Sequence, residues 1–137
     1  MKPPEAARRD IALQWLQKAD GDFEVAEHLL ADGGRFREAV AFHCQQAVEK
    51  YVKAILVKHG IEFAKTHDIR KLLELCAAVR PDLPADLNDA DMLTPFGVEV
   101  RYPGDAPELL PGEELQAFEI ATRAREAAAI LRNPGSS

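Results

Sequence analysis

RFREAVAFHCQQAVEKYVKAILVKHG, residues 35–60, is the stretch that decides the fold. Its apolar residues recur at steps of three and four, the pattern of a helix with one buried stripe. They are Phe36, Val40, Cys44, Ala47, Tyr51, Ala54 and Ile55. A second face carries four polar residues that line up along about three turns of the helix. These are His43, Gln46, Lys50 and Lys53. A hydrophobic core does not require that polar row, so we expect the chemistry of the protein to lie near it.

Amphipathic patterns also flank this helix on both sides. The sequence predicts helices over residues 11–31, 35–59, 68–79, 86–98 and 111–131. Gly33 and Gly60 end the first two, because glycine adopts the left-handed conformation found after helix C-termini. The fourth pattern is weaker, since Pro95 interrupts it, and three prolines between residues 100 and 112 mark a long loop. No stretch alternates like a strand, so the fold class is all-α, an up-and-down bundle of four to five helices.

Length and composition describe one ordinary globular domain. The 137 residues are 47% hydrophobic and 29% charged, which fits a single domain over 1–137 with flexible ends at 1–10 and 133–137. No apolar run approaches the roughly 20 residues that span a bilayer, and the N-terminus lacks the apolar core of a signal peptide. We therefore expect a cytoplasmic protein without membrane contact.

The two cysteines, Cys44 and Cys76, each lie among apolar residues of a predicted helix. Two cysteines form neither a disulfide framework nor a zinc site, so both are expected to be buried, reduced thiols. The alternative is a reactive Cys44 beside His43, although adjacent helical residues do not face one another. No zinc-ligand spacing, phosphate-cradling glycine loop or nucleophile elbow occurs, and we expect no metal and no cofactor.

The charge of the chain is unevenly distributed. The net charge is −6, which argues against indiscriminate nucleic-acid binding. Residues 35–71, however, hold eight Lys/Arg against four Asp/Glu, a local charge of +4 that leaves −10 for the remainder. A phosphate-binding surface should therefore belong to this part of the chain. There the polar row could bind a nucleotide or a phosphate backbone; alternatively it is a solvated face in which Glu49 pairs with Lys53.

Two further groups could contact phosphate. His67 and Asp68 immediately precede a predicted helix, whose N-terminal N–H groups favour anions; the alternative is simple capping by Asp68 or Thr66. Arg101 and Tyr102 open the long loop with a fork-shaped donor and a phenol, suited to phosphate binding and base stacking. Equally, Arg101 could pair with a neighbouring acid and Tyr102 could pack in the core.

Three ordered blocks resemble the HEPN domain family over residues 20–131. They are FHCQQAVEKYVKAILVKHG at 42–60, THDIRKLLELC at 66–76 and RYPGD at 101–105. The resemblance implies an up-and-down helical bundle that commonly dimerises and is often encoded beside a nucleotidyltransferase in two-gene toxin–antitoxin pairs. We accordingly expect a homodimer, a nucleotidyltransferase partner protein and a nucleotide or RNA ligand. The expected ligand-binding residues are Gln46, Lys50, Lys53, His67, Asp68, Arg101 and Tyr102.

Catalysis is the alternative that the resemblance leaves open. Many members of the family are metal-independent endoribonucleases that use an Arg, four to six arbitrary residues and then a His. Arg37 and His43 fit this spacing, but six helical steps place them about 120° apart around the axis. No His follows Arg101. An endoribonuclease would draw on His67, Arg101, His43 and Arg37, whereas a third hypothesis is a non-catalytic interaction scaffold.

Overall fold

The structure, a computed structural model, describes residues 4–97 and 108–132. The elements are α1 (Glu5–Leu30), α2 (Arg37–Lys58), α3 (Ile69–Cys76), α4 (Leu83–Asp86), the 3₁₀ segment η1 (Asn88–Phe96), α5 (Glu113–Ala128) and the 3₁₀ segment η2 (Ala129–Arg132). No strand occurs within these two ranges, and the predicted all-α helical bundle is confirmed. None of the helices found there combines the length and hydrophobicity needed to cross a bilayer.

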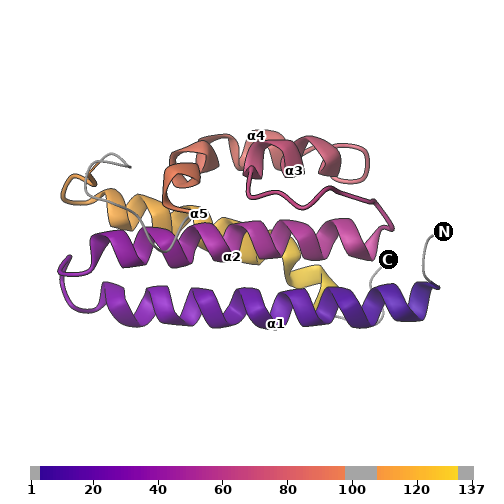
Figure 1. The fold of residues 1–137 in the computed structure, drawn as a ribbon, viewed down its shortest axis with the longest axis horizontal. Coiled ribbons are helices and arrows are strands. Elements are labelled where there is room, and N and C mark those ends of the chain that lie inside the picture. The colour runs from indigo at the N-terminus through magenta and orange to yellow at the C-terminus, as the bar shows by residue number, and fades with distance from the viewer. Residues whose placement is uncertain (1–3, 98–107, 133–137) are drawn as a thin grey trace.

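The first two helices form an antiparallel hairpin along the length of the molecule (Figure 1). Gly33 and Gly34 make the turn with φ angles of 65° and 87°, values that glycine adopts without steric cost. α1 begins at Glu5, directly after Pro4, because proline lacks the N–H that a helix start would leave unpaired. Part of the N-terminal segment that was expected to be flexible is therefore helical.

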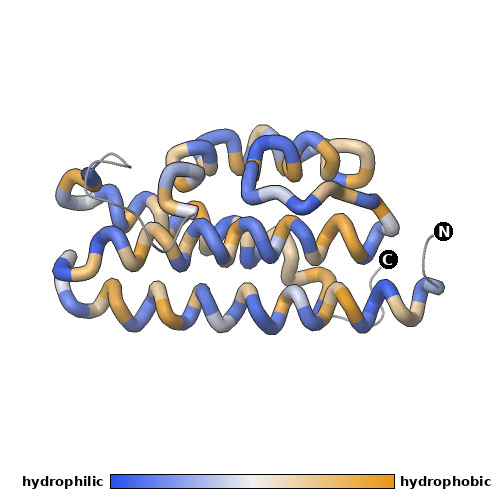
Figure 2. The backbone as a smooth tube through the Cα atoms, viewed as in Figure 1, coloured by the Kyte–Doolittle hydropathy of each residue, from blue (hydrophilic) through white to orange (hydrophobic). Residues whose placement is uncertain are grey.

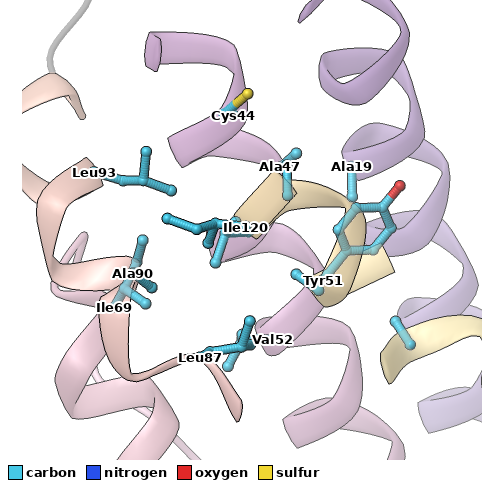
Figure 3. Packing of buried hydrophobic residues seen from close by; sticks show 14 of the residues in the cluster. Ala19, Cys44, Ala47, Tyr51, Val52, Ile69, Leu87, Ala90, Leu93 and Ile120 are labelled. Atoms are coloured by element: carbon cyan, nitrogen blue, oxygen red, sulfur yellow. The ribbon is translucent and has the colours of Figure 1, made fainter. Parts of the chain in front are cut away.

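α2 is the central helix of the bundle. It packs against α1, α3, η1 and α5, which surround it in Figure 1. Figure 2 shows hydrophilic stretches along α2 even though it lies between other elements. Figure 3 shows the apolar side chains that close the core around it, including Ala47, Val52, Leu93 and Ile120. Burial of such apolar area is the main stabilising term of the fold.

Several remaining boundaries depart from the predictions, and α3 ends at Cys76, before the predicted end at residue 79. The helix predicted over 86–98 is instead the short α4 followed by η1, and Pro95 inside η1 cannot donate a backbone hydrogen bond. The last helix begins after Gly112, later than predicted, and tightens into η2. Two local signals are confirmed: Gly60 has a φ of 69° after α2, and Asp68 caps α3 by accepting the Lys71 backbone N–H at 3.3 Å.

Both cysteines are free and buried, as predicted. Burial raises the pKa of the Cys44 thiol to about 12 and that of Cys76 likewise to about 12. A thiol with such a pKa holds almost no thiolate near neutral pH, and the thiolate is the nucleophile. The structure therefore gives no support to a reactive Cys44.

Candidate functional site

A buried polar stripe runs along α2 through Gln45, Glu49 and Lys53. The three residues are spaced by four, so they lie on one side of the helix. Their exposed fractions are only 0%, 3% and 6%. The pairing of Glu49 with Lys53 foreseen as one alternative is present, with 2.9 Å between Nζ and Oε2, but the pair is buried and not on a solvated face. Buried charges are tolerated when they are paired and hydrogen-bonded.

Glu49 is the centre of this polar stripe. Its Oε2 atom accepts from Lys53, and its Oε1 atom accepts from Gln45 Nε2 at 3.1 Å and from His67 Nδ1 at 2.9 Å. His67 comes from the irregular connection between α2 and α3, 18 residues further along the chain. We call His67, Glu49 and Lys53 the inner triad. Both carboxylate oxygens of Glu49 therefore accept at least one hydrogen bond.

The two ends of the inner triad lie in opposite environments. The Lys53 ammonium lies 5.3 Å from the centre of the Trp15 ring and 5.8 Å from that of Phe63, within the range of cation–π attraction. The His67 side chain, in contrast, is 66% exposed. Because Nδ1 donates to Glu49, the other ring nitrogen, Nε2, is left for a partner outside the triad. The arrangement thus buries an ion pair and presents an imidazole to solvent.

A second group of the same composition joins α1 to α2. Asp22 of α1 accepts from His43 Nδ1 at 2.9 Å through Oδ1 and from Lys50 Nζ at 2.5 Å through Oδ2. We call His43, Asp22 and Lys50 the outer triad. All three side chains are partly exposed, at 26%, 14% and 22%. His43 and Lys50 are seven residues apart on α2, so one carboxylate of α1 reaches both.

The other residues singled out from the sequence are distributed around these triads. Gln46 Nε2 donates to Gln45 Oε1 at 2.7 Å and to the Gly97 carbonyl at 3.5 Å. Arg37 Nε lies 3.3 Å from Glu114 Oε1 of α5. Arg37 and His43 therefore face different carboxylates and do not form one group. Arg101 and Tyr102 lie outside the described residues.

Comparison with known proteins identifies the family. The family model for the HEPN domain matches residues 12–133. The chain belongs to the HEPN domain family. Among solved structures, the crystal structure of ST0689, an archaeal HEPN homologue, is similar with a TM-score of 0.59 and 31% sequence identity, covering 88% of this chain and 94% of that one. Comparison with curated protein sequences gave no significant match. The resemblance drawn from the three sequence blocks is thereby confirmed.

Three polar residues of this HEPN domain were not assigned to a site from the sequence: Gln45, Glu49 and Asp22. Gln45 and Glu49 did leave a signal, because with Lys53 they form a polar stripe at strict four-residue spacing along α2. Asp22 left none, since its contact with His43 depends on how α1 and α2 are aligned. Within the described residues, no group of three or more His, Cys, Asp or Glu side chains could hold a metal ion.

A third carboxylate of the HEPN domain, Asp20 of α1, adds to the polar contacts between α1 and its neighbours. It accepts from the Tyr51 hydroxyl at 2.5 Å and from both terminal nitrogens of Arg132 at 2.8 Å. Burial acts to raise the pKa of Asp20, but the hydrogen bonds from Arg132 and Tyr51 outweigh it and leave the pKa below its ordinary value. Burial and the neighbouring Asp20 raise the pKa of Tyr51. Figure 3 shows the Tyr51 hydroxyl beside Ala19 of α1.

Proposed function

We propose that this HEPN domain binds the phosphate groups of a nucleotide or of RNA at the exposed edge of His67. The observation that carries the proposal is the contrast within the inner triad: the His67 ring is largely exposed, yet its Nδ1 is held by a buried carboxylate. An exposed side chain that serves only packing has no need of such a support. A fixed imidazole with a free Nε2 is, in contrast, a suitable hydrogen-bonding partner for a phosphate oxygen.

Charge near His67 supports the same proposal. Lys65 and Lys71 lie close to His67 in sequence, both are exposed, and neither ammonium forms an ion pair with a described residue. Lys50 and Lys53 are instead engaged by Asp22 and Glu49. In the proposal Lys50 and Lys53 hold Asp22 and Glu49 in place, while Lys65 and Lys71 supply positive charge for the ligand. Gln46, Asp68, Arg101 and Tyr102 keep their proposed places around the ligand.

The partners in the proposal follow from family membership. Members of the family commonly dimerise and are often encoded beside a nucleotidyltransferase, so we propose a homodimer that works with such a partner in a two-gene toxin–antitoxin-type system. The chain then contributes the phosphate-binding half of the pair.

A second candidate function is RNA cleavage as a metal-independent endoribonuclease. It is favoured by one observation, the hydrogen bond from His67 Nδ1 to Glu49, because a carboxylate that orients an imidazole is a common arrangement for general acid–base catalysis. His67 would move the proton and Arg101 would stabilise the phosphate. Arg37 and His43 are less suited to act as a pair in this reaction, since Arg37 contacts Glu114 of α5 and His43 contacts Asp22 of α1, and the two do not form one group.

The test is a titration of the purified protein with ATP and with a short, fluorescein-labelled single-stranded RNA. We expect His67→Ala to weaken binding about tenfold or more, the loss of one hydrogen bond to a charged group. His59→Ala is the matched control, since His59 is also exposed but lies at the C-terminal end of α2. Equal binding by wild type and His67→Ala would refute the site. No binding by wild type, together with stable association with a nucleotidyltransferase, would favour the scaffold.

Cleavage is followed with the same RNA in the same preparations. An endoribonuclease requires that the wild type cut the RNA and that His67→Ala abolish cutting while His59→Ala retains it. Binding of intact RNA without cleavage restricts the function to phosphate binding.

A further inference from the structure

We infer that Glu49 is a positioning residue of this site: it fixes the His67 ring so that Nδ1 carries the proton and Nε2 faces the ligand. The inference rests on the proposed function, because it assigns a purpose to the ring that binds phosphate. Glu49 would not touch the ligand, since it is 3% exposed and lies behind His67. Its effect on binding would pass entirely through the imidazole.

The contacts of Glu49 show that it does not need His67. Lys53 balances its charge at 2.9 Å, and Gln45 donates to Oε1 at 3.1 Å, so both oxygens have a donor from α2 itself. Removing the His67 ring would leave a carboxylate that is still paired and hydrogen-bonded. The ring, in contrast, has a single partner for Nδ1 in the described residues. The position of the His67 ring therefore depends on Glu49, whereas Glu49 does not depend on His67.

The connection that carries His67 is also held without the ring. The Ile61 backbone N–H donates to the Leu56 carbonyl at 2.9 Å, the Asp68 N–H donates to Thr66 Oγ1 at 3.1 Å, and Ile69 is fully buried. These contacts fix the connection at its start and at its end. An additional hydrogen bond to an exposed ring adds little to that anchoring. The main effect of the hydrogen bond between His67 Nδ1 and Glu49 is therefore to orient the ring.

The rest of the network places a fixed cation beside the Glu49 carboxylate. Lys53 cannot move away readily, because Trp15 and Phe63 lie against its ammonium and it is itself 6% exposed. A carboxylate beside a fixed cation accepts a hydrogen bond more strongly than a neutral acceptor does. A donated Nδ1–H in turn sets the tautomer of the imidazole.

The experiment must remove Glu49 without leaving a buried charge. Glu49→Leu combined with Lys53→Met does so, because replacing a buried ion pair by apolar residues of similar size is often neutral or stabilising. Glu49→Gln combined with Lys53→Met is the conservative match, since its amide oxygen can still accept from His67 Nδ1. Thermal unfolding of both double variants checks that they remain folded.

Two readouts are measured on these variants. The first is the ¹⁵N signature of the His67 ring, which distinguishes the tautomers without any ligand. We expect the Nδ1–H form to dominate in wild type and in the Gln variant and to lose its dominance in the Leu variant. The second is affinity for the labelled RNA and for ATP. We expect the Leu variant to lose about tenfold, as His67→Ala does, and the Gln variant to stay within about threefold of wild type.

A thermodynamic cycle completes the test. If Glu49 acts through the ring, adding His67→Ala to the Leu variant causes no further loss of affinity, because coupled residues are not additive. An unchanged tautomer in the Leu variant, or additive losses, would overturn the inference while leaving the phosphate site in place. Loss of the tautomer preference without any effect of His67→Ala on affinity would instead refute the proposed function and, with it, the role of Glu49 in binding.

Discussion

The inner and outer triads have the same composition, a histidine, a carboxylate and a lysine, and yet they are built differently. In the inner triad, the carboxylate and the lysine share α2 and are buried, while His67 reaches them from a connection and remains exposed. In the outer triad, the carboxylate lies on α1 and accepts from two residues of α2, all three being partly exposed. The first arrangement presents a ring to solvent, whereas the second fastens two helices together. The environment of the carboxylate, more than the residue types, separates a candidate site from a structural contact.

The largest expected difference between the triads lies in the cost of removing the lysine. Lys53→Met leaves Glu49 buried without its cation, and we expect it to lower the free energy of unfolding by about 3 kcal/mol. Lys50→Met leaves Asp22 partly solvated and still bonded to His43, so about 1 kcal/mol or less is expected. Urea denaturation followed by circular dichroism measures both. Equal losses would remove the distinction between the triads.

Asp20 extends the comparison to a carboxylate whose charged partner is an arginine, Arg132, which keeps its charge over the whole pH range of a stability measurement. Asp20→Asn weakens the contacts with Arg132 and Tyr51, and we expect a loss of about 1.5 kcal/mol near neutral pH. Because the pKa of Asp20 is lowered in the folded state, its stabilisation is present above the ordinary value of 3.8 and is lost as the pH falls through the folded value. Stability measured against pH should show the gap between variant and wild type closing only below about pH 4. A gap that is constant into acid would contradict the assignment.

Gly97 offers a perturbation that reaches the inner triad through Gln45. A Cβ atom at Gly97 would lie 3.1 Å from Cδ and Nε2 of the buried Gln45, which donates to Glu49. Its φ of −73° suits alanine, so a loss must come from displacing Gln45. We expect Gly97→Ala to cost about 1 kcal/mol and to shift the NMR signals of His67 but not those of His43. The cost should largely disappear in a Gln45→Ala background, and persistence of the full cost there would exclude this explanation.

The smallest expected effect has the opposite sign and lies beside the outer triad. Gly21 sits inside α1 between Asp20 and Asp22, and a Cβ there would meet no atom within 4 Å. Gly21→Ala should therefore raise the free energy of unfolding by roughly 0.5–1 kcal/mol, through the better helix propensity of alanine. Thermal unfolding measures the gain. A loss instead would show that the outer triad needs a flexible α1 at this point.

The predictable parts of the fold were those with local causes. Apolar periodicity located the helices, while Gly60 and Asp68 placed two of their ends, because capping depends on residues within one turn. The 3₁₀ segment η1 was predicted as part of an α-helix. Its pattern of apolar residues is helical in both cases, and only the position of Pro95 argues for the tighter form.

The site was predictable only in part. His67 and the lysines of α2 were singled out as candidates from residue type and spacing, but the partners of His67, His43 and Lys50 depend on contacts between separate elements. His67 meets Glu49 across an irregular connection, and His43 meets Asp22 across the hairpin. The polar row was also expected to face solvent or a ligand; within it Lys53 is buried against Glu49, whereas His43 and Lys50 remain partly exposed and contact Asp22. Its charges are consequently satisfied within the protein, and periodicity alone does not carry that information.

The contact between Asp20 and Arg132 has a consequence for synthesis of the chain. Its two residues are 112 positions apart, and Arg132 lies near the C-terminal end of the sequence. On a ribosome, the hairpin of α1 and α2 with its outer triad can form once both helices have emerged, whereas Asp20 meets Arg132 only after α5 and η2 have been translated as well. The contacts of Asp22, and that of Asp20 with Tyr51, can therefore form in the nascent protein before the ion pair between Asp20 and Arg132.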